Sequence, residues 1–181
     1  RLRFGGYLLA VGTLEPRKNL RTLVSAYSAP RPRERTAPLV VVGGGGWGEL
    51  RLPPEARAMQ REGTLRYLGA VPDRHLRSLY EGAIALLFPS IYEGFGMPVV
   101  EAMSCGTPVV HSHGTSVDEI TMGLAKCLSP LDVDAWSEAL REILARGYIF
   151  DEGLRTSLRR QALEFSWTKS AEKVHGAYRR L

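Results

Sequence analysis

Short apolar runs of strand length alternate with amphipathic stretches through most of this 181-residue chain. A buried strand needs only about four to eight apolar residues, whereas an amphipathic helix spaces its apolar side chains roughly three or four positions apart. Their alternation is the pattern of repeated strand–helix units, in which the strands pair in parallel. The sequence therefore predicts an α/β fold, a Rossmann-like, doubly wound parallel sheet of about six strands flanked by helices, with further helices at the C-terminus.

Six segments have the length and the apolar content of buried strands. They are Tyr7–Val11, Leu39–Gly43, Leu65–Leu68, Ile84–Phe88, Val109–His111 and the less apolar Lys126–Leu128. Amphipathic stretches follow three side chains that can cap a helix, namely Asn19, Asp73 and Asp132. Helices are accordingly expected after Asn19, after Asp73 and over Asp132–Ala145, Glu152–Phe165 and Thr168–Leu181, and the clearest loop is Ala29–Pro38.

The order of the strands decides where a ligand can bind. In a doubly wound sheet the first and fourth strands are neighbours at the point where the strand order reverses, and ligands bind beyond their carboxyl ends. The loops that follow Val11 and Phe88 should therefore face each other across a crevice.

The second of these loops leads into the most informative segment of the chain, Pro89–Pro108. Gly94 and Gly96 allow the backbone to approach a ligand closely, and the proline after them suits the start of a helix, whose N-terminus attracts anions. Two carboxylates, Glu93 and Glu101, would repel a bare phosphate, so they are expected to face hydroxyl groups on the same ligand. A ligand with both phosphate and many hydroxyls is a nucleotide sugar.

The first loop, Gly12–Asn19, carries an Arg-Lys pair just before a helix start. Arg17 offers a forked set of donors and Lys18 a compact charge, and together they could balance a diphosphate. Taken alone, the loop also fits a solvated turn whose acid and bases pair with one another. Its place opposite the glycine-containing loop favours the ligand-binding interpretation.

Other interpretations of these motifs stay open. Glu93 and Glu101 could be the acid and base of a glycoside hydrolase, although such enzymes need no phosphate-binding apparatus. One of the two could instead cap the helix while the other lies on the surface. The run Gly43–Gly46 is either a plain turn or a backbone passage close to the nucleoside, because the dinucleotide fingerprint belongs after the first strand.

A metal site is not expected. His111 and His113 alternate at a strand end and could bring two imidazoles to a metal, but the sequence shows no Cys or carboxylate cluster to complete a site around them. A structural or sugar-adjacent role is predicted for both. The chemistry is then independent of metal and cofactor, with Arg17, Lys18 and helix dipoles supplying the positive charge.

The composition adds limits on partners and compartment. The net charge is +5, and a solvated basic surface, acidic lipid headgroups or an anionic substrate would each account for it. Nucleic acid is not an expected partner, because Arg31 to Arg35 alternates with Pro and Glu without aromatic residues.

Cys105 and Cys127 look like reduced thiols of a cytosolic protein. The apolar runs are too short for a transmembrane helix, and the start at Arg1 suggests a piece of a longer protein.

These residues resemble the C-terminal, donor-binding half of the retaining glycosyltransferases of family 4. Such enzymes have the GT-B architecture, in which two Rossmann-like domains face each other across a cleft. The resemblance covers nearly the whole chain and rests on Val11–Asn19, Val41–Gly44, Tyr67–Asp73, Leu79–Ala83, Phe88–Ser90, Tyr92–Val110, Ser116–Ile120 and Phe165–Trp167. Its most specific part is the pair of acids, Glu93 and Glu101, with Gly-Phe-Gly between them.

The resemblance implies roles for individual residues. Glu93 is expected near the hydroxyls of the donor sugar and Glu101 on the ribose diol, while Val71 lies where backbone groups usually meet the base. The implied donor-binding set is Gly12, Thr13, Arg17, Lys18, Gly44, Val71, Glu93, Gly94, Phe95, Gly96, Met97 and Glu101, and the catalytic candidates among them are Glu93, Lys18 and Arg17.

Three departures from the family pattern bear on donor selectivity rather than on the fold. Thr13 stands where many relatives carry Arg, so Arg17 is expected to supply that charge. The segment His111-Ser-His113-Gly replaces the more usual small and polar residues, and Asp118 stands where Pro is common.

The implied reaction is transfer of a hexosyl group from a nucleoside diphosphate sugar to an acceptor hydroxyl, with retention of configuration. The first loop resembles bacterial mannosyltransferase-like members, which favours GDP-mannose over UDP-sugars. Residues 1–166 are expected to form the nucleotide-sugar-binding domain and residues 167–181 a helix that crosses back to an absent N-terminal acceptor-binding domain. The chain alone should therefore bind donor without transferring it. The expected location of the protein is the cytoplasm, either free or peripherally at the inner face of the membrane. A phosphorylase or epimerase half and a non-catalytic nucleotide-sugar-binding module are the alternatives.

Overall fold

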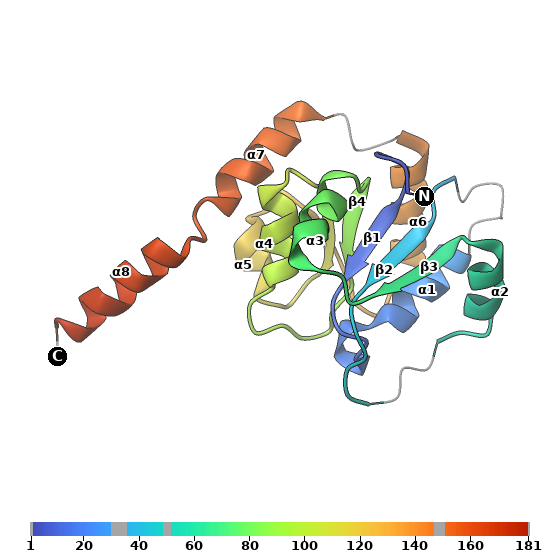
Figure 1. The fold of residues 1–181 in the computed structure, drawn as a ribbon, viewed down its shortest axis with the longest axis horizontal. Coiled ribbons are helices and arrows are strands. Elements are labelled where there is room, and N and C mark those ends of the chain that lie inside the picture. Colours follow the sequence, from blue (N-terminus) through green and yellow to red (C-terminus); the bar gives the residue numbers. More distant parts are fainter. Residues whose placement is uncertain (1, 30–35, 49–51, 147–150, 181) are drawn as a thin grey trace.

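The computed structural model describes residues 2–29, 36–48, 52–146 and 151–180. Six strands in this part form one parallel sheet, in the order β3-β2-β1-β4-β5-β6 (Figure 1). Their bounds are β1 (Leu8–Val11), β2 (Leu39–Val42), β3 (Leu65–Gly69), β4 (Ala85–Phe88), β5 (Val109–Ser112) and β6 (Lys126–Leu128). The predicted doubly wound fold is confirmed, because β1 and β4 are neighbours where the strand order reverses.

The described helices are a short 3₁₀ turn and eight α-helices. They are η1 (Pro16–Lys18), α1 (Leu20–Ser28), α2 (Glu55–Glu62), α3 (Asp73–Glu81), α4 (Met97–Ser104), α5 (Val117–Thr121), α6 (Val133–Arg146), α7 (Glu152–Ala162) and α8 (Trp167–Tyr178). The sequence did not predict α2 or α5. Helix α2 buries only Ala56 and Met59, so it shows few apolar side chains in the sequence, and α5 is little more than one turn long. Residues 30–35 of the predicted loop lie outside the described part.

The predicted helix caps are right in one case of three. The carboxylate of Asp132 accepts a hydrogen bond from Ala135 N–H at 2.9 Å, as a cap should. Asp73 is the first residue of α3, and Pro72 precedes it. Asn19 does precede α1, but its side chain accepts no hydrogen bond from the backbone of the helix, because it is engaged elsewhere.

Two helical layers cover the sheet. Alternate strand residues point to opposite faces, so that Leu8 and Leu39 join one apolar cluster while Leu9 and Val40 join the other. The first cluster is closed by side chains of α1, α2 and α6, such as Leu23, Met59 and Trp136. The second is closed by side chains of α3, α4, α5 and α7, such as Tyr80, Met103, Ile120 and Leu158. In Figure 1 these two groups of helices lie on opposite sides of the strands.

Asn19 joins the loop after β1 to two other loops. Its backbone is left-handed, with a φ of 53°, a conformation that Asn tolerates better than most residues. Its amide donates to the carbonyl oxygens of Pro89 at 3.0 Å and Pro130 at 2.6 Å, while its own oxygen accepts from the Thr22 hydroxyl at 2.8 Å. The buried amide thus fixes the first loop against the end of β4.

Two glycines of the run after β2 are required by close packing within the protein. Gly43 has a φ of 150°, and a Cβ at this position would overlap the carbonyl oxygen of Gly12. A Cβ on Gly46 would overlap the side chain of Glu15. The Leu14 N–H donates to the carbonyl of Gly44 at 3.0 Å, so the loops after β1 and β2 continue side by side beyond the strands. The plain-turn interpretation of this run does not account for its contact with the loop after β1.

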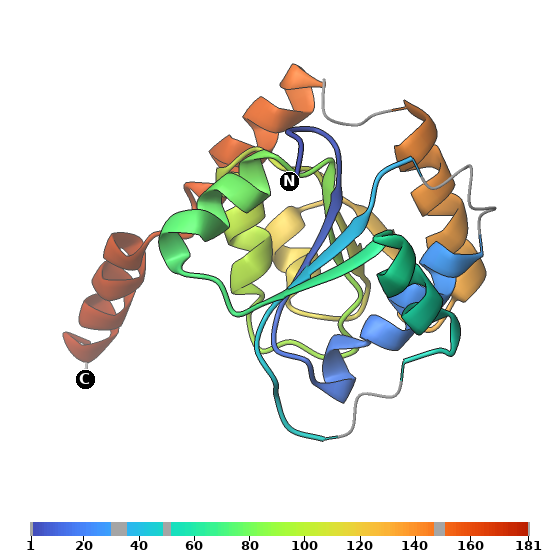
Figure 2. The same cartoon turned by 45° about the vertical axis from the view of Figure 1, so that its right-hand side comes forward.

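Helix α8 leaves the body of the molecule (Figure 1 and Figure 2). Ser166 caps it by accepting from Lys169 N–H at 3.1 Å, but none of its residues is buried. Its large apolar side chains are exposed, with Trp167 at 83%, Val174 at 57% and Tyr178 at 72%. No helix in the described residues combines the length and the apolar character needed to cross a membrane.

The substitution Gly43→Ala should lower the free energy of unfolding by at least about 2 kcal/mol, because it adds both an unfavourable φ and a backbone overlap. Urea titration followed by circular dichroism measures the loss. Gly45→Ala is the matched control in the same run, because a Cβ there meets no atom within 4 Å. The control should change stability by less than about 0.5 kcal/mol. Equal effects of the two substitutions would contradict this account of Gly43.

The substitution Asn19→Gly should cost about 2 kcal/mol, because it keeps the left-handed backbone but leaves the carbonyls of Pro89 and Pro130 without the amide. Thr22→Val removes only the hydroxyl that donates to Asn19, and its loss should be smaller. Denaturant unfolding of both variants checks the order, and a larger loss for Thr22→Val would contradict it.

Candidate functional site

The loops after β1 and β4 meet at the carboxyl edge of the sheet, where the strand order reverses. The Ile91 N–H donates to the Arg17 carbonyl at 2.8 Å, which links the backbones of the two loops directly. Together with the Asn19 amide, this bond brings the Arg-Lys pair of the first loop to the acid of the second.

Four charged side chains form one cluster across these loops. Lys18 Nζ lies 2.6 Å from Glu93 Oε1, and Arg17 Nη1 lies 3.1 Å from Glu93 Oε2. Arg17 Nε also pairs with Glu15 Oε2 at 2.8 Å. Each oxygen of Glu93 therefore faces one cation, and Arg17 bridges the two carboxylates. Arg17 pairs within its own loop, as the solvated-turn interpretation expects, but it also pairs across to Glu93 in the second loop.

The charges of this cluster balance. The hydrogen bond from the Thr13 hydroxyl, at 2.6 Å, is the main reason that the pKa of Glu15 lies below its ordinary value; desolvation opposes the shift and Arg17 adds to it. Glu15 is thus ionised at neutral pH, and two carboxylates face two cations. Glu93 is 9% exposed, so its ion pairs lie in a partly desolvated place where charge interactions are stronger than in bulk water.

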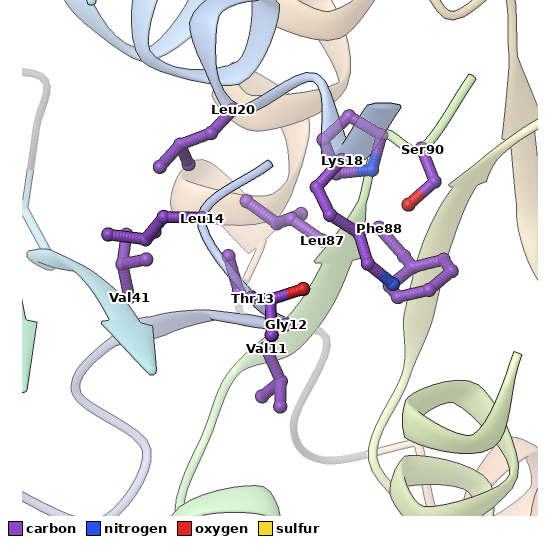
Figure 3. Close-up of a pocket in the computed structure, with 12 residues that line it drawn as sticks. Val11, Gly12, Thr13, Leu14, Lys18, Leu20, Val41, Leu87, Phe88 and Ser90 are labelled. Carbon is purple, nitrogen blue, oxygen red and sulfur yellow. The ribbon is translucent and has the colours of Figure 1, made fainter. Parts of the chain in front are cut away.

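A small pocket opens beside the cluster, between β1 and β4 (Figure 3). Gly12, Thr13, Lys18 and Ser90 are among its lining residues, and the Lys18 ammonium lies 5.0 Å from the centre of the Phe88 ring. The Ser90 hydroxyl is buried, and among the described residues it has no hydrogen-bond partner. A buried hydroxyl without a partner is costly unless a ligand or water satisfies it.

The glycine-containing loop leads into α4 as predicted, although the helix starts at Met97 and Pro98 is its second residue. Gly96 has a φ of 113°, and a Cβ there would lie 2.8 Å from Val117 Cγ2, so packing against α5 already requires glycine. Gly94 is different, because a Cβ at that position would meet open space. Of the two glycines, only Gly94 has free space for a close approach by a ligand.

Glu101 makes its described contacts with residues outside the ion cluster. It accepts a hydrogen bond from the Tyr80 hydroxyl at 2.8 Å, and it lines a separate hollow with Asp73, Leu76 and Arg77. Burial is the main reason that the pKa of Tyr80 is raised, and the Glu101 carboxylate raises it further. The two acids of the motif therefore have different partners, cations for Glu93 and a phenol for Glu101.

The remaining predicted donor residues are spread along the same edge. Phe95 is 45% exposed and stacks edge to face on Phe165, with 6.0 Å between the ring centres. Met97 is also exposed, and Val71 is half-buried beside β3. The carbonyl of Gly44 accepts a hydrogen bond from the Leu14 N–H.

Ser116 is a positioning residue that sequence reasoning missed. Its hydroxyl lies 2.7 Å from the Phe95 carbonyl and 3.1 Å from the Glu93 carbonyl, so it holds the backbone of the glycine-containing loop from the side of α5. A serine before an unpredicted one-turn helix gave no signal of this contact.

The expectation that no Cys or carboxylate joins the histidines is wrong for His111. Its Nδ1 lies 3.6 Å from Asp118 Oδ1, and Cys127 Sγ lies 3.3 Å from the same carboxylate oxygen. Burial lowers the pKa of His111, whereas burial and the Asp118 carboxylate raise the pKa of the Cys127 thiol to about 11. A neutral thiol of this kind is a poor nucleophile at neutral pH. His113 is exposed and lies outside this group.

The chain is similar in sequence to known proteins. Residues 5–164 match the family model of glycosyl transferases group 1. The chain is 40% identical over 185 residues to the O-antigen chain mannosyltransferase B of Escherichia coli. The aligned region covers 99% of this chain and 47% of that protein. It is 32% identical over 187 residues to the D-inositol 3-phosphate glycosyltransferase of Acidothermus cellulolyticus, covering 97% and 41% respectively. The chain thus spans less than half the length of these curated relatives.

Solved structures match over the same range. Sucrose-phosphate synthase from Thermosynechococcus elongatus superimposes with a TM-score of 0.76 at 25% identity, over 99% of this chain and 46% of the other. Anabaena HepE in complex with UDP gives a TM-score of 0.79 at 19% identity, over 98% and 50%, a likeness that concerns the fold alone. The sheet order, the site at its reversal and these matches lead to one conclusion: this chain belongs to the glycosyl transferases group 1 family and has the Rossmann-like fold of GT-B glycosyltransferase structures.

Proposed function

We propose that this chain is the donor-binding half of a hexosyltransferase, which moves a hexosyl group from a nucleoside diphosphate sugar to an acceptor hydroxyl. The observation that carries the proposal is the convergence of Arg17 and Lys18 on Glu93 across the strand reversal. Ligands of doubly wound folds bind at this place. Family membership independently supports glycosyl transfer.

The two cations are the groups that would balance the diphosphate. Lys18 has three N–H donors and makes one described bond to Glu93, and Arg17 presents its remaining guanidinium donors from a side chain that is 34% exposed. Glu93 holds both charges in a fixed geometry. Preorganised cations stabilise a developing negative charge without having to reorient during the reaction, and such electrostatic stabilisation is usually the main source of rate enhancement in catalysis of this kind.

The two carboxylates are the groups that would receive hydroxyls. A carboxylate can accept about four hydrogen bonds, and two of those at Glu93 go to the cations, which leaves capacity for hydroxyls of the donor sugar. Glu101, oriented by Tyr80, would bind the ribose diol. Backbone groups near Gly44 and Val71 would meet the base, and those of Gly94, Phe95, Gly96 and Met97 the sugar and diphosphate.

In this mechanism the leaving diphosphate gains charge while the sugar becomes oxocarbenium-like. Arg17, Lys18 and the N-terminus of α4 would stabilise the diphosphate without a metal ion, while Gly12, Thr13 and Ser90 line the pocket beside Lys18. Retention of configuration is part of the proposal because the family resemblance implies it.

The other half of the enzyme would bind the acceptor. The two curated relatives described above are more than twice as long as this chain, which is consistent with a second domain that precedes it. We propose that residues 1–166 bind the donor and that residues 167–181 cross back to that domain, which would cover Trp167 and Val174 of α8. The assembled enzyme would act in the cytoplasm, at the inner face of an acidic membrane.

The proposed donor is GDP-mannose. The relative that shares 40% identity with this chain is named a mannosyltransferase, and so are several others of lower identity. This supports mannose over other hexoses, in agreement with the form of the first loop.

Nucleotide affinity tests the site. The chain is titrated calorimetrically with GDP, UDP and ADP and then with their sugars, and GDP should bind most tightly. Lys18→Ala and Glu101→Ala should each weaken nucleotide binding about 10- to 100-fold, the worth of one hydrogen bond to a charged group. Lys126→Ala is the matched control, because Lys126 pairs with Glu142 at the far edge of the sheet and should leave affinity unchanged. Unchanged affinity in both test variants would show that the site is assigned wrongly.

Transfer tests the function. The isolated chain should bind donor and form no glycoside, because the domain proposed to align an acceptor with the sugar lies outside it. A longer form that includes the preceding half should transfer mannose to an acceptor hydroxyl. Chromatography of the labelled product measures this transfer. Glycoside formation by the isolated chain would contradict the proposal. Reaction of the longer form with inorganic phosphate in place of an acceptor would identify a phosphorylase instead.

A further inference from the structure

We propose that His111, Asp118 and Cys127 form a binding site for a zinc-class divalent cation. The three residues come from different elements, namely the end of β5, the first turn of α5 and the middle of β6. One potential ligand atom from each lies within 4.8 Å of the other two. Imidazole, carboxylate and thiolate are the side chains with which proteins bind Zn²⁺.

The spacing of the three atoms fits tetrahedral coordination. Ordinary zinc bond lengths place neighbouring ligand atoms about 3.3 to 3.6 Å apart around a tetrahedral ion. The observed separations are 3.3 Å between Cys127 Sγ and Asp118 Oδ1, 3.6 Å between His111 Nδ1 and Asp118 Oδ1, and 4.0 Å between Cys127 Sγ and His111 Nδ1. Movements of a few tenths of an ångström would bring all three within bonding distance of one ion.

Two further contacts orient the ligands. His111 Nε2 lies 3.1 Å from the Thr121 hydroxyl, so the imidazole can carry its proton there and turn a lone pair on Nδ1 toward a cation. A cation would then replace the proton that Nδ1 shares with the Ser112 carbonyl at 2.9 Å. Asp118 Oδ2 accepts from Gly114 N–H at 2.7 Å, which leaves Oδ1 for the ion.

The site is open to solvent on one side. His111 is buried, whereas Cys127 is exposed and the Asp118 side chain is 42% exposed. An ion can therefore enter without unfolding, and the fourth coordination position is left to water. His111 and Asp118 are two of the positions at which this chain departs from the family pattern, and the structure brings these departures together with Cys127.

An ion at this place would act on the glycine-containing loop. His111 and Asp118 bracket the segment that holds Ser116, and the Ser116 hydroxyl contacts the carbonyls of Glu93 and Phe95. An ion bound to both His111 and Asp118 would restrict the motion of this segment and so of the Ser116 contacts with the loop. None of the three ligand residues lines the pocket beside Lys18, and the test of ion binding does not depend on the proposed function.

Cobalt binding to the chelator-treated chain tests the proposal. Wild-type protein should bind one Co²⁺ per chain with a thiolate-to-cobalt charge-transfer band, which Zn²⁺ abolishes by displacement. Cys127→Ala and Asp118→Asn should each weaken binding by more than about 100-fold, since even removal of an outer-shell partner costs up to that factor. Cys105→Ala is the matched control, because its thiol lies outside the cluster, and it should retain the band.

Circular dichroism of each variant without metal shows whether it has folded. The exposed positions of Cys127 and Asp118 make retention of the fold the expected result. Hydrogen exchange provides a second readout, since Zn²⁺ should slow the amides around Ser116 in wild type but not in Cys127→Ala. Absence of the thiolate band in wild type, its persistence in Cys127→Ala, or its loss in Cys105→Ala would each overturn the proposal.

Discussion

The pairing of Glu93 with Arg17 and Lys18 is the interaction on which the carboxyl edge of the sheet depends. Glu93 comes from the loop after β4, and both cations that face it come from the loop after β1. A carboxylate in so protected a place would be costly without partners, and two neighbouring cations would repel each other without an acid between them. Each loop therefore stabilises the charges of the other. The arrangement exists only because the strand order reverses between β1 and β4, which brings the two loops together.

The sequence predicted what depends on local pattern and on topology. Strands β1, β2, β4 and β5 are recognisable because each buries nearly every residue. That the loop of Arg17 and Lys18 faces the loop of Glu93 follows from the reversal of strand order. Contacts set by packing between distant elements could not be predicted. Nothing in the spacing of Asp118 and Cys127 shows that they reach His111, and Asn19 looked like a helix cap although its amide binds carbonyls of two other loops.

Glycine has more than one role at this edge. A glycine-rich loop is commonly interpreted as space for a ligand, but Gly43 is needed because the Gly12 carbonyl lies against it, and Gly96 because Val117 does. Their absent side chains allow neighbouring loops and helices to approach closely. Of the two glycines in the second motif, Gly94 alone faces open space. Packing thus accounts for Gly96 but not for Gly94, and sequence alone cannot separate the two cases.

Helix α8 has a consequence for how the molecule can be observed. A twelve-residue helix that buries none of its side chains lies near the limit of independent helix stability in water. Its helix–coil equilibrium is therefore thermodynamically coupled to any surface that covers it. Trp167 stands at its first turn and is 83% exposed, whereas Trp136 is enclosed in the core. A blue shift of the Trp167 emission would be an intrinsic optical signal that α8 has become covered.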